Sequence, residues 1–148
     1  IELAASVARL MAARAGRRGL TNVRVAQADS RAAVNLLLPD RSVAVYHIYF
    51  PDPWPKPRHQ KHRVLTPAVV ASLARTLSPG GVIHIASDVR EWAREMFAML
   101  SAGGFAELKN EASGAGFSGF GRKYTAAGRP IFSATFGKQG AISRHVRI

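Results

Sequence analysis

Apolar residues recur along the chain with the spacing of helices and strands in turn. Val7, Leu10 and Met11 are spaced as on one face of an amphipathic helix. Ser30 and Thr66 can each cap the first turn of a further helix by offering a side-chain oxygen to its exposed amides. The pattern therefore predicts helices over residues 4–15, 30–38, 66–77 and 89–100.

Strands are predicted where apolar residues alternate or run together. Residues 42–50, SVAVYHIYF, are β-branched and aromatic with almost no charge, which is typical of a strand covered on both faces. The last strand is expected to begin after Pro130 or to lie at a sheet edge, because proline cannot donate a ladder hydrogen bond. The expected strands cover residues 22–28, 42–50, 82–86, 105–108 and 130–136.

This alternation of strands with helices predicts a doubly wound α/β domain with a mostly parallel sheet. Residues 110–128 are rich in Gly, Ala and Ser, show no period and are interpreted as a loop. We expect one domain over residues 1–136 and a basic tail over residues 137–148. Because the chain starts in apolar sequence without a methionine, we expect the domain to lack its first strand, upstream of Ile1.

The chain carries a large excess of positive charge, with 21 Lys and Arg against 9 acidic residues and a net charge of +12. Such a field favours a polyanionic partner, and solubility alone is the alternative explanation. The absence of cysteine excludes disulfides, thiolate metal ligands and a cysteine nucleophile, and is compatible with a reducing cytoplasm. No apolar run approaches the roughly 18 residues of a membrane span, so we expect a cytoplasmic protein without a membrane partner.

Four acidic residues follow apolar or strand-like runs. Ligands of doubly wound sheets bind outside the carboxyl ends of the strands, so these residues are expected on one rim of the sheet. Any of them taken singly could instead be a turn residue or a helix cap. The four are Glu2, Asp29, Asp52 and Asp88.

Asp52 stands between two prolines in the most unusual stretch of the chain, YFPDPWPKPRHQKHR. Pro51 and Pro53 fix their own φ angles and favour extended geometry before them, so the carboxylate is expected to be held rigidly where the strand ends. It could accept hydrogen bonds from the Watson–Crick edge of a guanine and stabilise positive charge nearby. Trp54 either stacks on a base or packs under the loop. A rigid proline turn without a ligand is the alternative.

A cationic run follows this turn directly. It concentrates charge beside the proposed site, which suits the phosphate groups of a nucleic acid. Zinc binding by the two histidines is a competing hypothesis that we do not favour, because no third ligand is in view. The run comprises Lys56, Arg58, His59, Lys61, His62 and Arg63.

The stretch FPDPWPKPRHQKHR, with LTP at residues 65–67 and the segment from SPGG at residues 78–81 to Ser87 and Asp88, resembles the bacterial tRNA (guanine-N7-)-methyltransferase family. The resemblance runs from Ile1 to about Phe136, and its PDPWPK-x-RH-x-K-x-R core is highly specific. It implies a Rossmann-like class I methyltransferase fold that uses S-adenosylmethionine and acts on a guanosine of the tRNA variable loop. Guanine N7 has an available lone pair, so direct displacement needs no prior deprotonation.

The resemblance also implies a role for each candidate residue. Glu2 and Asp29 would contact the adenosine part of the cofactor, and Asp52 would be catalytic and close to the methyl donor. Substrate binding is implied for Lys56, Asp88, Ser118 and Phe120, and RNA contacts for Arg58, His59, Lys61, His62 and Arg63.

Two departures from the family pattern leave alternatives open. The sequence contains no GxGxxG, so the glycine-rich cofactor motif would lie before Ile1. The residues Ser118, Phe120 and Gly121 stand where the family has Thr-x-Phe-Glu, so Gly121 replaces a base-recognising glutamate. The alternatives are a non-catalytic RNA-binding relative and an amino-group methyltransferase with another substrate.

Overall fold

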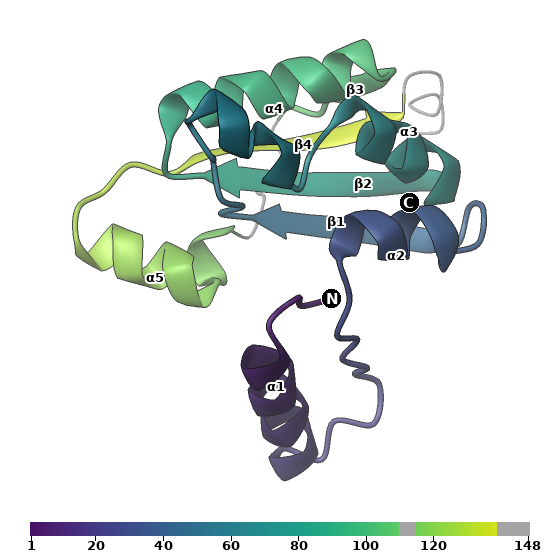
Figure 1. Ribbon diagram of the computed structural model, residues 1–148, viewed down its shortest axis with the longest axis vertical. Helices are drawn as coiled ribbons and strands as arrows, with labels where there is room; N and C mark the ends of the chain where they lie inside the picture. The colour runs from purple at the N-terminus through teal and green to yellow at the C-terminus, as the bar shows by residue number, and fades with distance from the viewer. Residues whose placement is uncertain (110–114, 139–148) are drawn as a thin grey trace, which may run out of the picture. The chain divides into compact units, whose positions relative to one another are not determined.

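The computed structural model describes residues 1–109 and 115–138 (Figure 1). These residues form two compact units, the first over residues 1–38 and the second beginning at Pro39. Within the described ranges, no helix is long and apolar enough to cross a membrane.

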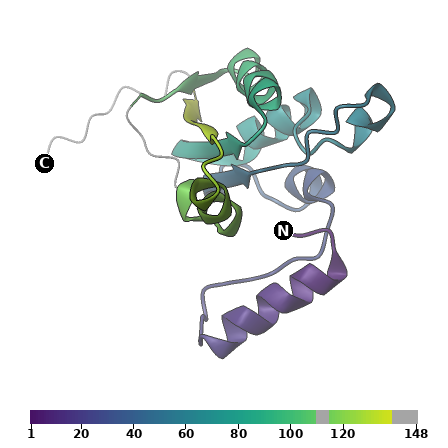
Figure 2. The same cartoon turned by 90° about the vertical axis from the view of Figure 1, so that its left-hand side faces the viewer.

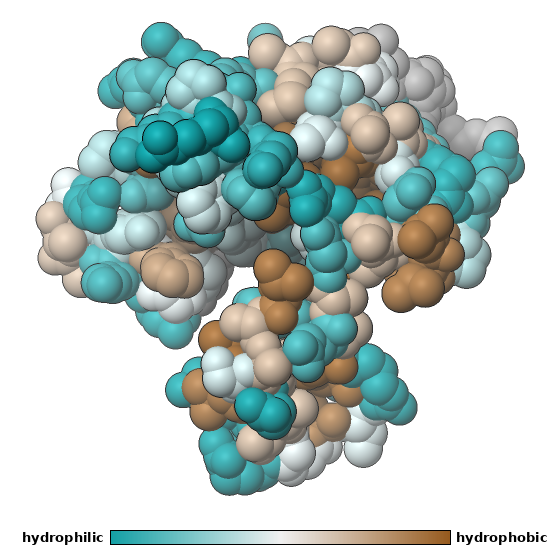
Figure 3. Space-filling model, in the orientation of Figure 1, coloured by the Kyte–Doolittle hydropathy of each residue, from teal (hydrophilic) through white to brown (hydrophobic). Residues whose placement is uncertain are grey.

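The first unit opens with α1 (Ala5–Arg17), which confirms the helix predicted at the start of the chain. Its apolar residues stay accessible, because Val7, Leu10 and Met11 are 42%, 45% and 44% exposed. Figure 3 shows apolar side chains on the surface of this unit. The amphipathic pattern therefore predicted the helix correctly, whereas its apolar stripe is not buried.

The connection from α1 to α2 (Ser30–Leu36) differs from the prediction at two points. The strand expected over residues 22–28 is wrong, since the pairing there is a single parallel bridge between Gln27 and Glu2. The chain turns into α1 directly after Glu2 and leaves no length for a ladder. The cap of α2 is Asp29 rather than Ser30, which is already helical.

The second unit is built on a sheet in which four strands are described (Figure 1). β1 and β2 are parallel, whereas β4 is antiparallel to both of its neighbours, β2 and β3. Three strands therefore run in the same direction, which confirms the α/β class and the mostly parallel sheet. The strands are β1 (Val43–Tyr49), β2 (Leu77–Ser87), β3 (Phe105–Glu107) and β4 (Phe132–Lys138), in the order β1-β2-β4-β3.

Of the two alternatives for the last strand, the first is confirmed, because β4 begins after Pro130 and lies inside the sheet. The expected coverage of both faces is wrong for β1, because none of its residues is buried and Val45 is 41% exposed. An uncharged run predicts a strand but not whether other elements cover its faces.

Helices α3 (Pro67–Thr76) and α4 (Arg90–Ala102) lie on the same side of the sheet (Figure 2). Thr66 caps α3 by accepting the Val69 N–H at 3.3 Å, ahead of the first-turn Pro67, as predicted. The segment SPGG at residues 78–81 follows directly after this helix and belongs to the irregular start of β2. Fully buried core residues between the helices and the sheet include Leu73, Ile83, Ile85, Trp92, Met96, Leu100 and Phe136.

The loop predicted over residues 110–128 is wrong in its later part. The 3₁₀ turn η2 (Ala115–Phe117) and the helix α5 (Gly119–Ala126) occupy it, and residues 110–114 lie outside the described ranges. α5 is short and contains two glycines, and its apolar face consists of Phe120 and Tyr124, so the pattern was too brief to be recognised as a helix. β4 extends to Lys138, and the rest of the predicted basic tail also lies outside the described ranges.

Candidate active site

The chain leaves β1 in a strained turn around Asp52. Phe50 donates its backbone N–H to the carbonyl oxygen of Ala86 at 2.8 Å, which continues the pairing of β1 with β2. Phe50 and Trp54 then adopt left-handed φ angles of 52° and 41°. Such angles are unfavourable for residues with a Cβ atom and concentrate at functional sites. Asp52 lies midway between these two strained residues.

The Asp52 side chain is open to solvent. The residue is exposed, and its carboxylate forms no hydrogen bond or ion pair with the residues that the structure describes. The carboxylate oxygens therefore remain available as acceptors, and the rigidity expected at this position stays a prediction.

The cationic run that follows forms the 3₁₀ helix η1 (Pro57–His62) and its flanks. Trp54 is half-buried against two imidazoles, with ring centroids 5.8 Å from His59 and 5.5 Å from His62. Arg58 donates from Nε to Nε2 of His59 at 3.1 Å, so this nitrogen acts as an acceptor. Among the described residues, no group of three or more His, Cys, Asp or Glu could hold a metal ion. The exposed members of the run are Lys56, Arg58, Lys61 and His62.

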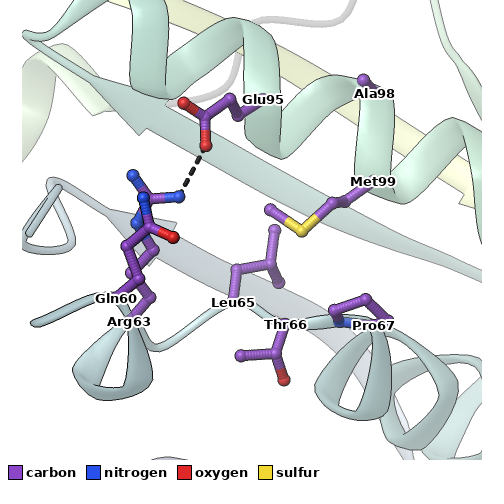
Figure 4. A pocket seen from close by; sticks show the side chains of 8 residues that line it. All are labelled: Gln60, Arg63, Leu65, Thr66, Pro67, Glu95, Ala98 and Met99. Atoms are coloured by element: carbon purple, nitrogen blue, oxygen red, sulfur yellow. Dashed lines mark hydrogen bonds and ion pairs between the residues drawn. The ribbon is translucent and has the colours of Figure 1, made fainter. Parts of the chain in front are cut away.

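Arg63, the last member of the predicted RNA-binding run, is packed against α4 (Figure 4). Its Nε donates to the carbonyl oxygen of Pro53 at 2.8 Å, and its Nη1 lies 2.6 Å from Oε2 of Glu95. The guanidinium carbon stands 4.3 Å from the ring centroid of the buried Trp92. The side chain is only 14% exposed, so Arg63 joins the Asp52 turn to α4. Arg63 and Glu95 also line a pocket of about 400 Å³ between η1, the start of α3 and α4.

Asp88 follows β2 as Asp52 follows β1, and this part of the predicted rim is confirmed because the two strands are parallel neighbours. Nη2 of Arg129 lies 2.9 Å from Oδ2 of Asp88, whose side chain is 17% exposed. The sequence reasoning missed Arg129. It comes beside Asp88 because the antiparallel pairing of β2 with β4 puts Ser87 opposite Phe132, and no local pattern reveals that register.

Aromatic side chains join α5 to the Asp52 turn. The ring centroid of Phe50 lies 5.2 Å from that of Tyr124 and 6.2 Å from that of Phe120. The guanidinium carbon of Arg129 stands 4.6 Å from the Tyr124 ring centroid. Figure 1 shows α5 beside the carboxyl ends of β1 and β2. Phe120 is 58% exposed, so the structure brings an accessible aromatic ring next to the turn that carries Asp52.

Ser118 and Gly121 are both used by the local fold. The Ser118 hydroxyl donates to the carbonyl oxygen of Ala115 at 2.7 Å and accepts the N–H of Gly121 at 2.9 Å. A Cβ atom on Gly121 would come within 2.0 Å of the same carbonyl oxygen. The glutamate of the family pattern therefore has no room at this position, because η2 packs closely against α5 there.

The other two acidic candidates, Glu2 and Asp29, lie in the first unit. Oε1 of Glu2 accepts the N–H of Ala4 at 2.8 Å. Asp29 accepts the backbone N–H of Arg31 at 2.9 Å and pairs with its guanidinium at 2.6 Å. The side-chain hydrogen bonds from Arg31 lower the pKa of Asp29 to about 2. Asp29 thus matches the helix-cap alternative, and a single rim that includes these two acids stays a prediction.

A polar row that the sequence reasoning did not single out crosses the sheet. Nδ1 of His47 lies 2.7 Å from the Tyr49 hydroxyl, and the His47 ring stacks on that of His84 with centroids 5.1 Å apart. Nδ1 of His84 lies 2.8 Å from Oγ1 of Thr135. Burial, together with the neighbouring His84, lowers the pKa of His47. His47 and Tyr49 share one face of β1, whereas His84 and Thr135 join them through the strand register, which the sequence pattern does not reveal.

The chain is similar to methyltransferases over most of its length. The family model described as "Putative methyltransferase" matches residues 1–134. The tRNA (guanine-N(7)-)-methyltransferase of Paracidovorax citrulli is 48% identical over 89 residues, which are 60% of this chain and 36% of that protein. The protein of the same name from Cupriavidus metallidurans is 45% identical over 99 residues, which are 67% of this chain and 38% of that protein. The aligned segments thus cover little more than a third of these relatives.

Solved structures with the same fold include the cyclase SpnF and a SAM dependent methyltransferase from Aquifex aeolicus. SpnF is 15% identical with a TM-score of 0.59, over 92% of this chain and 64% of its own. The Aquifex aeolicus protein is 14% identical with a TM-score of 0.59, over 90% of this chain and 64% of its own. This likeness confirms the Rossmann-like methyltransferase fold.

Proposed function

The chain belongs to the methyltransferase family whose model matches residues 1–134, and we propose that it serves to transfer a methyl group from S-adenosylmethionine to N7 of a guanine in tRNA. The observation that carries this proposal is the Asp52 turn, in which an exposed carboxylate stands on a constrained backbone at the end of β1. The two relatives described above carry the name of this activity. A tRNA substrate implies the cytoplasm as the compartment.

Asp52 is proposed to bind the guanine and to be catalytic. Its two carboxylate oxygens can accept the N1–H and N2–H donors of one guanine edge, which orients N7. Its negative charge stabilises the positive charge that develops on the base during alkylation. S-adenosylmethionine supplies an electrophilic methyl group, and N7 needs no general base because it carries an available lone pair.

The neighbouring side chains supply the other contacts with the RNA. Phe120 offers an exposed ring for stacking on a base, and Asp88, held by Arg129, offers carboxylate oxygens to the substrate. Lys56 and the exposed cations of η1 suit phosphate groups, which add affinity that weakens with salt. Among the residues assigned to RNA contacts, Arg63 is the exception because its charge is already paired.

Glu2 and Asp29 are the residues of this chain that we propose for the adenosine part of the cofactor. Glu2 fits the chemistry of a ribose better, because a carboxylate can accept two hydroxyl donors and only its Oε1 has a partner among the described residues. Both oxygens of Asp29 are already bonded to Arg31, which suits an indirect role as the cap of α2.

The test compares the complete gene product with its Asp52→Asn variant on tRNA. We expect 7-methylguanosine in digests of the methylated tRNA, and a fall in kcat of at least about 100-fold in the variant while tRNA affinity changes little. Mass spectrometry of the nucleosides measures the product. An undiminished rate would remove the catalytic role of Asp52. A methyl group on an exocyclic amine would identify an amino-group methyltransferase, and no binding of S-adenosylmethionine in calorimetry would identify a non-catalytic relative.

A further inference from the structure

The turn that carries Asp52 has few means of holding itself in place. Pro51, Pro53 and Pro55 have no N–H group, so the backbone on either side of Asp52 lacks the donors that usually anchor a loop. Phe50 and Trp54 hold left-handed φ angles that relax unless the surroundings oppose it. Upstream, the bond from Phe50 to Ala86 provides one anchor. A second anchor is required downstream of Asp52.

Arg63 provides that second anchor. Its Nε donates to the carbonyl oxygen of Pro53, the residue directly after Asp52, at 2.8 Å. The same guanidinium is fixed by Glu95 at 2.6 Å and by the face of Trp92 at 4.3 Å. Both of these residues belong to α4, which packs on the sheet, so the turn is tied to the core of the second unit.

The surroundings of Arg63 disfavour a phosphate contact. Its charge is paired with Glu95, its plane is stacked on an indole that is 1% exposed, and its own side chain is 14% exposed. A phosphate would have to displace Glu95 and would meet the repulsion of that carboxylate. Arg58, in the same run, is exposed and has no carboxylate partner among the described residues.

We propose that Arg63 is a positioning residue for methyl transfer, which holds the Pro53 carbonyl and thereby the carboxylate of Asp52, and that it does not bind RNA phosphate. This inference rests on the proposed role of Asp52. The three contacts use the Nε–H, one terminal N–H pair and the flat face of the guanidinium, and an ammonium group cannot make all of them at once. Arginine is therefore required at this position, whereas positive charge alone is sufficient for a phosphate contact.

The experiment measures kcat, KM and tRNA affinity for the complete gene product and four variants. Arg63→Lys keeps the charge but loses the Pro53 contact, and Glu95→Gln loosens Arg63 without touching the turn. We expect both to lower kcat, by about tenfold or more for Arg63→Lys, while tRNA affinity and its salt dependence stay within about twofold of the wild type. Arg58→Ala should weaken tRNA binding and reduce the salt dependence. Arg94→Ala, on the exposed face of α4, is the matched control and should change neither.

The two proposals fail in different ways. If Asp52→Asn retains full activity, the function proposed for Asp52 is wrong whatever Arg63 does. If Asp52→Asn is inactive but Arg63→Lys keeps its kcat, the positioning role is overturned. Weaker tRNA binding by Arg63→Lys, or tighter binding by Glu95→Gln with unchanged kcat, would show that Arg63 contacts RNA. Thermal unfolding of each variant separates a loss of fold from a loss of kcat, and Glu95→Gln remains a test if Arg63→Lys does not fold.

Discussion

Asp52 and Asp88 follow two adjacent parallel strands of one sheet, yet the structure holds them in opposite ways. At Asp52 the backbone is fixed on both sides, by Ala86 and by Arg63, and the carboxylate is open. At Asp88 the carboxylate itself is held, at 2.9 Å from Arg129, and is 17% exposed. A carboxylate that must meet the reacting base needs unoccupied oxygens in a fixed place, whereas one that shapes the surrounding site can be engaged by a neighbouring cation.

Replacing each aspartate by glutamate should produce the largest difference in activity between the two positions. Asp52→Glu moves the carboxylate outward by one methylene on a backbone that cannot adjust, so we expect a loss in kcat of about 100-fold. Asp88→Glu should lose only about tenfold in kcat/KM, because the half-exposed Arg129 side chain can follow the longer residue. Steady-state kinetics on tRNA measures both. Equal losses at the two positions would show that both carboxylates are held with the same precision.

Arg129, the partner of Asp88, stacks on Tyr124 of α5. The packing of α5 against η2 leaves no room for a side chain at Gly121. A Cβ atom there would approach the Ala115 carbonyl oxygen to 2.0 Å, so Gly121→Ala should lower the free energy of unfolding by about 1–3 kcal/mol. Gly119→Ala is the matched control, because nothing lies within 4 Å of its added Cβ atom. It should be neutral or stabilise the protein by up to about 1 kcal/mol. Chemical unfolding measures both values, and equal stability of the two variants would contradict the packing.

The parts of the molecule that the sequence predicted well depend on local chemistry. Thr66 and Pro67 start α3 because a cap and a first-turn proline act within a few residues. The uncharged run of β1 and the prolines around Asp52 likewise act over short distances. These signals were sufficient to predict the fold class and the position of the candidate carboxylate after β1.

The parts that it predicted poorly depend on contacts between distant residues. The pairing of Arg63 with Glu95 was not predicted, because the two residues lie 32 positions apart and the cationic run shows only the charge of Arg63. Arg129 was missed because Asp88 lies 41 positions away, across a register that hydropathy does not encode. α5 was taken for a loop because it is short and glycine-containing, and because its aromatic residues Phe120 and Tyr124 pack against the distant Phe50.

Removing Arg129, the partner of Asp88, should lower the activity less than a substitution at Asp52. Arg129→Ala leaves Asp88 without its ionic partner and Tyr124 without its stacked guanidinium. Since Arg129 is 54% exposed, we expect a loss of about 1 kcal/mol, or roughly fivefold in kcat/KM. Arg129→Lys should recover part of it by keeping the charge. A loss as large as that of Asp52→Asn would place Arg129 in direct contact with the substrate.

The carboxylate of Asp29 is also held by an arginine, which lies only two residues away, and we expect the smallest effect there. Arg31 lowers the pKa of Asp29 from 3.8 to about 2, so the ion pair stabilises the fold above pH 4 and this contribution is lost as the pH falls towards 2. Both side chains are 36% exposed, which limits the effect to less than about 1 kcal/mol. Arg31→Gln should therefore unfold more easily than the wild type at pH 5, and most of this difference should be gone at pH 2, as followed by urea unfolding at each pH. A difference at pH 2 as large as that at pH 5 would mean that Arg31 stabilises α2 by packing rather than through the Asp29 carboxylate.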